Sequence, residues 1–408
     1  MTEIIRLTEE SRAPRRLFLP SLVISRFAIS PPAILTAYLL IDIGHTFGTP
    51  VGVTGQIRTG ASLIGAITAV LMGVWSVRFK HKSLLLLGLS YLCISAIGCT
   101  LALNFTMMLI AFSLYGVGLA MVMPMVFALV GEHFPLEQRA RAIGWLFTGG
   151  SLAFIISAPV IGVIAVFGGW RLAFLGVMLP APILSFMLTT KVVPPPALSL
   201  QLLGNQRQYI EGFKRIFGNS SALACLISSV LGNAAYQALE LYGASFFRER
   251  FLVSLEFTSI YFLGGASSFV LGFQVSGRVI NRYRRNPVMI LTSVVAGICI
   301  ISFMNMLNLW LFFVFEFLSC AFLGMMFTAA SSLTLEQVPD FRGSMMSFNS
   351  TAEFMGAALG AGVGGFILFF WNYAWVGLVL GAMNLIIAIL VYFVIIDPTS
   401  TESYVSKS

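Results

Sequence analysis

The chain has 408 residues, of which 58% are hydrophobic and only 10% are charged, and its formal net charge is +8 at pH 7. A soluble globular domain carries about 25% charged residues, so this composition excludes an ordinary soluble protein and indicates an integral membrane protein. The basic residues lie in short stretches between apolar runs and form no stripe on a polar domain, so the positive charge does not indicate a nucleic-acid partner.

Twelve apolar runs follow one another along the chain, each close to the length of about 20 residues that a helix needs to cross a bilayer. In order they are Leu19–Ile41, Val53–Val77, Ser83–Leu103, Thr106–Val130, Ile143–Phe167, Leu172–Val192, Ala222–Phe246, Phe257–Ile280, Val288–Met306, Leu309–Leu333, Met346–Phe370 and Tyr373–Ile395. These runs predict an all-α integral membrane protein with twelve transmembrane helices.

A polar interval divides the runs into two sets of six, and the two halves repeat at a spacing of half the chain length. Gly73 corresponds to Gly277, and Glu132 corresponds to Glu336. An internal repeat of this length predicts two pseudo-symmetric six-helix bundles. The expected divisions are a cytoplasmic tail over 1–18, a first bundle over 19–193, a linker over 194–221, a second bundle over 222–396 and a tail over 397–408. The linker is either a short amphipathic helix on the inner leaflet or a flexible tether.

Most lysines and arginines lie in the tails, in the linker and in the loops on one side of the predicted membrane. Cytoplasmic loops carry an excess of these residues. We therefore expect a multi-pass protein of the cell inner (plasma) membrane with both termini in the cytoplasm.

Two loops at corresponding positions share a pattern. Gly73 is followed by Arg78 in the first loop, and Gly277 is followed by Arg282 and Arg285 in the second. Repeated in both halves of a twelve-span chain, this pattern resembles the glycine–acid–arginine loop motif of the major facilitator superfamily. The resemblance implies the two-bundle fold of that superfamily and transport by alternating access, with spans 1, 4, 7 and 10 lining a central cavity. It also implies that the glycine permits close helix approach.

The chain departs from the motif at the acidic position, which holds Val77 and Asn281. A narrower resemblance concerns span 5, where Pro159 and Gly162 lie in the segment GGSLAFIISAPVIGV. This segment is similar to the glycine–proline motif of the twelve-helix drug:proton antiporter branch. That branch usually has an arginine in span 4, at the position that Phe112 occupies here.

Two acidic residues lie at one depth in spans expected to line the cavity. Glu240 is in span 7 and Glu316 is in span 10, each about 10 Å below the outer surface at 1.5 Å per residue. Two buried carboxylates that face each other share or exchange a proton, so we expect this pair to couple transport to protons. The resemblance supports the pair, because some drug exporters of the superfamily place acids in spans 7 and 10.

Span 7 also carries a polar stripe at helical spacing, made by Ser229, Asn233, Tyr236, Gln237 and Glu240. Such a stripe faces either a polar packing seam or the wall of a wet cavity. We expect a cavity wall that binds substrate, because a seam does not need a carboxylate.

Other charged residues lie in or near the spans. Arg26 in span 1 and Glu353 in span 11 share a depth, and we expect both to contribute to substrate binding. Arg26 and Glu353 either pair with each other or act apart, and Arg26 can also snorkel toward the inner surface. Asp42 and Arg58 lie near the outer surface, where we expect a solvated rim.

No phosphate-binding loop, metal-ligand spacing or catalytic triad occurs in the sequence. We therefore expect no enzyme activity, no cofactor and no metal. The expected partners are a small-molecule substrate, a proton and the lipid bilayer, and the expected state is a monomer.

Three functions are consistent with these features, and we expect the first. It is a secondary active transporter that works as a proton-coupled exporter of amphipathic or cationic small molecules by alternating access. The second is a facilitator-type transporter of a specific metabolite such as a sugar, an amino acid or an organic anion, with Arg26 as the substrate anchor. The third is a membrane sensor or assembly factor that does not transport.

Overall fold

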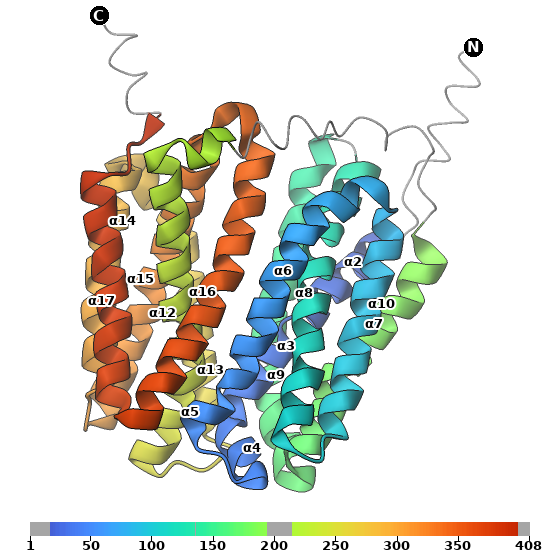
Figure 1. Cartoon of the computed structure of the whole chain (residues 1–408), viewed down its shortest axis with the longest axis vertical. Helices are drawn as coiled ribbons and strands as arrows, with labels where there is room; N and C mark the ends of the chain where they lie inside the picture. The colour runs from blue at the N-terminus through green and yellow to red at the C-terminus, as the bar shows by residue number, and fades with distance from the viewer. Residues whose placement is uncertain (1–16, 135, 194–213, 399–408) are drawn as a thin grey trace, which may run out of the picture.

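The computed structural model describes residues 17–134, 136–193 and 214–398 (Figure 1). The described chain is helical and contains no strand. Ten stretches are long and apolar enough to cross a membrane, and one of them, Arg141–Val192, has 52 residues and holds two predicted spans. The helix over Gln56–Arg78 has 23 residues and makes a further pass. The predicted all-α fold with twelve passes in two bundles is confirmed.

The first bundle contains the six spans before the linker. Its helices are α2 (Phe18–Ala28), α3 (Pro31–Tyr38), α4 (Leu40–Phe47), α5 (Val51–Thr54), α6 (Gln56–Arg78), α7 (His81–Thr100), α8 (Phe105–His133), α9 (Leu136–Ala173), the π-helix η1 (Phe174–Met178) and α10 (Pro180–Val192).

The second bundle contains the six spans after it. Its helices are α12 (Ser220–Phe251), α13 (Thr258–Tyr283), α14 (Arg285–Phe303), α15 (Leu309–Glu336), the 3₁₀-helix η2 (Pro339–Phe341), α16 (Arg342–Phe370) and α17 (Tyr373–Phe393). Most of the predicted linker lies outside the described residues; residues 214–217 are helical.

Several spans begin at an asparagine. The side chains of Asn104, Asn219, Asn308 and Asn372 each accept hydrogen bonds from backbone N–H groups in the first turn of the following helix. Such caps satisfy donors that have no partner within the helix. Short turns before these residues therefore still define sharp helix starts.

The first span is broken in the middle by two prolines. Pro31 and Pro32 occupy the first positions of α3, where a missing N–H costs nothing. Because proline cannot continue α2, that helix ends at Ala28. The break separates Arg26 on α2 from Tyr38 at the end of α3.

The two bundles meet at one end of the molecule. We call the end at which α10 ends and α12 begins the linker end, and the opposite end, which carries α4 and α5, the distal end. Figure 1 shows α6 and α16 close together at the distal end and diverging toward the linker end. At the distal end, Gly52 of α5 and Gly365 of α16 bring the two backbones into direct contact. A Cβ on either glycine would collide with the backbone oxygen of the other.

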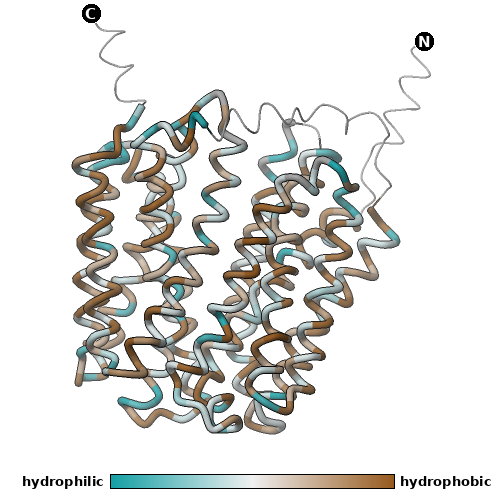
Figure 2. The backbone as a smooth tube through the Cα atoms, viewed as in Figure 1, coloured by the Kyte–Doolittle hydropathy of each residue, from teal (hydrophilic) through white to brown (hydrophobic). Residues whose placement is uncertain are grey.

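The outward-facing surfaces of the helices are apolar. Figure 2 shows hydrophobic residues along the length of the outer helices such as α17. Large side chains there are highly exposed, including Phe167 at 85% and Phe393 at 76%. Helices that satisfy their own backbone hydrogen bonds and expose apolar side chains suit the hydrocarbon core of a bilayer.

Candidate functional site

A central cavity of about 190 Å³ lies between the bundles. The first bundle contributes residues of α3, α6 and α8, and the second contributes residues of α12 and α16. Its polar lining residues are Arg58, Ser62, Tyr115, Asn233, Gln237, Ser350 and Glu353. Phe112 lines the cavity wall in span 4, so an aromatic ring borders the cavity there.

Arg58 of α6 joins the two bundles. Its Nη2 donates to Gln237 Oε1 and lies 3.3 Å from Glu240 Oε2, both on α12. The side chains of Arg58 and Glu240 are each only 9% exposed. The prediction that Arg58 lies on a solvated rim is therefore wrong. The first turn of α6 packs against the other bundle, so a residue close to the distal end along the chain is buried between bundles.

The predicted polar stripe on α12 divides between two cavities. Asn233 and Gln237 line the central cavity, whereas Tyr236 and Glu240 line a second, smaller pocket. The ring of Tyr236 packs against Phe269 and Phe327, with centroid distances of 5.0 and 5.9 Å. The stripe is therefore not one continuous substrate wall, and Tyr236 belongs to the smaller pocket.

The smaller pocket brings the two predicted proton-coupling residues together. Glu240 and Glu316 both line it, and its volume is about 40 Å³. One oxygen of each carboxyl group, Oε1, is buried without a hydrogen-bond partner among the described residues. A cavity of this size has room for water, since one water needs roughly 10–15 Å³ of such volume. The pocket is closed on one side by Phe154 of α9, which belongs to the first bundle.

Glu316 lies deep in the second bundle and is 1% exposed. Gly265 of α13 makes room for it, because a Cβ there would lie 2.6 Å from Glu316 Oε1. No described cation forms an ion pair with Glu316, whereas Glu240 has Arg58. The two acids are thus neighbours in one pocket with different charge environments.

Arg26 is not among the described residues that line the central cavity. Its Nη1 donates to Ser30 at 3.3 Å, and its guanidinium packs against Gly150 of α9. Arg26 and Glu353 form no ion pair in the described structure. Tyr115 lines the cavity, and its hydroxyl donates to Ile29 O at 2.9 Å.

Glu353 lines the central cavity and is held by a chain of hydrogen bonds. Ser229 donates to Asn349 Oδ1 at 2.6 Å, and Asn349 Nδ2 donates to Glu353 Oε1 at 2.8 Å. No described residue bonds the second oxygen, Glu353 Oε2. A fixed carboxyl group with one free oxygen therefore borders the cavity.

The loop-motif residues take several environments. Gly73 and Arg78 lie in the last turns of α6. Nothing lies within 4 Å of a Cβ placed on Gly277, so the expectation of close helix approach there is wrong in this structure. The reason is that the bundles diverge toward the linker end. Arg282 stacks over Tyr283, with its guanidinium carbon 5.3 Å from the ring centroid, and Arg285 Nη1 lies 3.8 Å from Asp397 Oδ1.

Span 5 does show close packing at its predicted motif. A Cβ on Gly162 would lie 2.6 Å from the hydroxyl oxygen of Tyr38. Pro159 lies inside α9 and is exposed. Gly162 thus lets the outer half of span 1 pack against α9, and the tyrosine reaches across to the second bundle by donating to Leu255 O at 2.5 Å.

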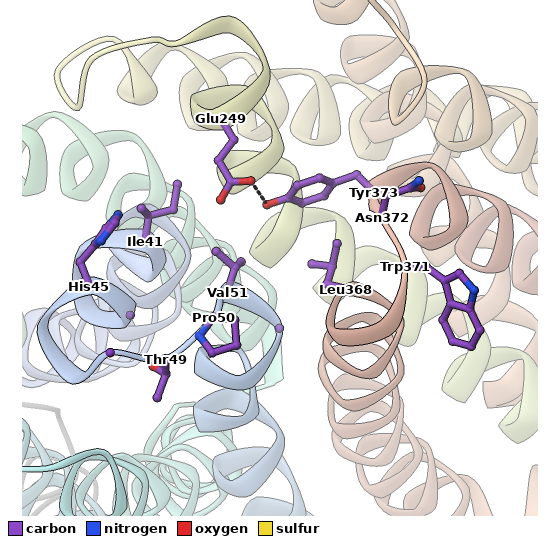
Figure 3. Close-up of a pocket in the computed structure, with 13 residues that line it drawn as sticks. Ile41, His45, Thr49, Pro50, Val51, Glu249, Leu368, Trp371, Asn372 and Tyr373 are labelled. Carbon is purple, nitrogen blue, oxygen red and sulfur yellow. Dashed lines mark hydrogen bonds between the residues drawn. The ribbon is translucent and has the colours of Figure 1, made fainter.

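The distal end holds a bridging ion pair beside an open groove. Arg248 Nη1 on α12 lies 2.6 Å from Asp42 Oδ2 on α4. The groove has a volume of about 590 Å³, and Figure 3 shows Glu249 and Tyr373 hydrogen-bonded to each other on the side opposite His45. Asp42 thus lies at the rim as predicted, but its carboxylate also ties one bundle to the other.

Helical passes, a cavity between two bundles and buried charged groups beside it are the architecture of a membrane transport protein. The family model described as Major Facilitator Superfamily matches residues 22–304 and again residues 257–408. The chain belongs to the Major Facilitator Superfamily and is a membrane transporter of that family.

Two curated relatives are similar in sequence. The chain is 26% identical to the "Probable 4-methylmuconolactone transporter" of Cupriavidus pinatubonensis over 335 residues, which is 80% of this chain and 77% of that protein. It is 32% identical to the hexuronate transporter of Bacillus subtilis over 125 residues, which is 31% of this chain and 30% of that protein.

Solved structures are similar in fold. A D-xylose-proton symporter has a TM-score of 0.78 at 15% identity, covering 94% of this chain and 99% of that chain. A nucleoside transporter has a TM-score of 0.76 at 14% identity, covering 92% and 98%. At these identities the likeness establishes the fold alone.

Sequence reasoning missed the partnership of Arg58 with α12 and the chain from Ser229 to Glu353. The first had no local signal, because the partners lie 182 positions apart. The second had one: Asn349 precedes Glu353 by four residues, which places both on one face of a helix.

Proposed function

We propose that this transporter moves small organic anions, such as carboxylate-bearing metabolites, together with a proton. The observation that carries this proposal is the buried ion pair between Arg58 and Glu240, whose guanidinium also lines the central cavity. Arginine is the preferred binding partner for carboxylates because its donors match both carboxylate oxygens.

Binding of an anion would exchange one carboxylate for another. A substrate carboxylate that enters the cavity competes with Glu240 for Arg58. Glu240 then lies buried without its cation, and a buried charge without a partner is costly. Glu240 therefore takes up a proton, so anion and proton are bound together, and release of both restores the ion pair.

Glu316 supplies the second acid of this proton site. It shares the small pocket with Glu240 and has no described cation beside it. Water in the pocket can carry a proton between the two carboxyl groups. Arg26 is not among the described residues that line the central cavity, so we assign it no contact with the anion in this conformation.

The size of the cavity supports a small metabolite. Sites for drug-sized ligands have volumes of about 300–1,000 Å³, and this cavity has about 190 Å³. The names of both relatives also refer to metabolites, and a hexuronate is a carboxylate.

The orientation follows from the basic residues. Arg78, Lys80, Lys82, Arg282 and Arg285 flank the turns between α6 and α7 and between α13 and α14. By the excess of positive charge in cytoplasmic loops, we place these turns, the linker end and both termini in the cytoplasm, in a monomer of the inner membrane.

A second candidate is the proton-coupled exporter of amphipathic cations. The observation in its favour is the small pocket, where Tyr236, Tyr261, Phe154 and Phe262 surround two carboxyl groups. Aromatic faces and carboxylates together attract organic cations.

A binding panel separates the two candidates. We would measure the affinity of purified protein for D-glucuronate, cyclohexanecarboxylate, D-glucose and tetraphenylphosphonium. The proposal predicts that the two carboxylates bind and that Arg58→Gln abolishes their binding. Binding of tetraphenylphosphonium alone, lost in Glu240→Gln, would replace the anion transporter by the cation exporter.

A further inference from the structure

The hydrogen-bond chain that ends at Glu353 has no part in the exchange between Arg58 and Glu240. Ser229 and Asn349 are 7% and 3% exposed, so the chain is built inside the second bundle and not on its surface. Because the Ser229 hydroxyl donates to Asn349 Oδ1, the amide of Asn349 presents its N–H group to Glu353. This fixes which oxygen of Glu353 is occupied, and it leaves Oε2 free beside the central cavity.

A fixed, free carboxylate oxygen recognises one kind of group on a neutral part of a ligand. It accepts hydrogen bonds from hydroxyl or N–H donors. The remaining polar lining of the cavity is uncharged and comes from Ser62, Tyr115, Asn233, Gln237 and Ser350, while Phe112 and Phe354 contribute apolar walls. One basic group, one acidic group and small hydroxyl-bearing residues therefore border one small cavity.

We infer that Glu353 is a specificity-determining residue that binds a hydroxyl group of the substrate, so that the substrate is a hydroxylated monocarboxylate. This inference rests on the proposed function, because the carboxylate of the same ligand is assigned to Arg58. A second carboxylate on the ligand would find no basic partner, because Arg58 is the one basic residue among the described residues that line the cavity. A ligand with a carboxylate but no hydroxyl groups would leave Glu353 Oε2 buried against an apolar surface. The protein would therefore bind that ligand with lower affinity.

Three probes separate the parts of this recognition. D-Glucuronate carries a carboxylate and hydroxyl groups on a six-membered ring. Cyclohexanecarboxylate carries the carboxylate alone, and D-glucose carries the hydroxyl groups alone. Affinities would be measured by isothermal titration with the full-length purified protein and with the variants Glu353→Ala, Glu353→Gln and Ser229→Ala.

The expected result is confined to one probe. Glu353→Ala weakens the binding of D-glucuronate by about tenfold or more, because a hydrogen bond to a charged group is lost. It changes the affinity for cyclohexanecarboxylate by less than about twofold. Glu353→Gln retains an acceptor and recovers most of the affinity. Ser229→Ala frees Asn349 to rotate. It therefore also lowers the affinity for D-glucuronate, by less than Glu353→Ala does.

Two outcomes overturn the inference. An equal loss for both carboxylates would make Glu353 a structural residue, and no loss for D-glucuronate would remove it from the binding site. Failure of the proposed function gives a different pattern, in which neither carboxylate binds to the parent protein. If D-glucose then bound and Glu353→Ala weakened it, the hydroxyl contact would stand while the anion proposal would fall.

Discussion

Arg58 and Glu240 lie 3.3 Å apart across the boundary between the two bundles, and both side chains are almost fully buried. Gln237 accepts a second hydrogen bond from the same nitrogen of Arg58. A charged pair in this place ties the substrate cavity to the acid pocket, because Arg58 lines the first and Glu240 lines the second. Any ligand that attracts Arg58 changes the surroundings of Glu240.

The effects of removing Arg58 and Glu240 on the stability of the folded protein should depend on each other. Removing one partner of a buried ion pair leaves the other charge uncompensated and costs roughly 3–5 kcal/mol, whereas removing both is often nearly neutral. We expect Arg58→Gln and Glu240→Gln each to lower the melting temperature in detergent, and the double variant to recover most of the loss. Additive losses in this double-mutant cycle would show that the two side chains do not interact in solution.

The ion pair between Asp42 and Arg248 should stabilise the closed distal end only weakly. Their side chains are 32% and 14% exposed, and partly solvated pairs contribute about 0.2–1 kcal/mol. A cysteine that replaces Ser62, in the central cavity, should therefore become about twofold to fivefold more accessible from the distal end when Asp42→Asn is introduced. The readout is the labelling rate with a membrane-impermeant maleimide. An unchanged rate would remove the pair from the closure.

Glycine should be required where the backbones touch and dispensable where they do not. A Cβ on Gly365 would collide with the Gly52 oxygen, while a Cβ on Gly277 meets nothing within 4 Å. We expect Gly365→Ala to open the distal contact and lower the melting temperature, with uptake reduced severalfold. Gly277→Ala is the matched control and should stay within about 0.5 kcal/mol of the parent protein. The reverse ranking would contradict the arrangement of the bundles.

Glu316 should matter for energy coupling and not for binding. It lies outside the central cavity and shares a pocket with Glu240. Glu316→Gln should therefore abolish accumulation driven by a pH gradient in proteoliposomes, while leaving the affinity for a carboxylate within about twofold. Normal accumulation in this variant would assign the proton to Glu240 alone.

The passes and the two-bundle organisation follow from sequence because each apolar run is long enough to span a bilayer and the loops repeat. Position along a helix is a poor guide to which neighbour a side chain meets. For this reason the sequence predicts a solvated rim for Arg58, although α6 packs against α16 and the Arg58 side chain reaches Glu240 of α12. The stripe on α12 was expected to face one cavity, but the packing of Phe154 and α13 divides it into two.

The same limit applies to the motif residues. Gly162 of the span 5 motif packs closely against Tyr38, as a helix-contact glycine should, whereas no described residue lies within 4 Å of a Cβ placed on Gly277 of the loop motif. Both glycines lie in predicted motifs, and the motifs alone do not show which of them meets a neighbouring helix. Only the divergence of the bundles toward the linker end distinguishes them.

The central claim is that a substrate carboxylate displaces Glu240 from Arg58 and that Glu240 then binds a proton. The most direct measurement is the pH change of a weakly buffered detergent solution of the protein when D-glucuronate is added. Our account predicts uptake of about one proton per bound anion in the parent protein and none in Glu240→Gln. Proton release on binding, or full uptake in Glu240→Gln, would contradict it.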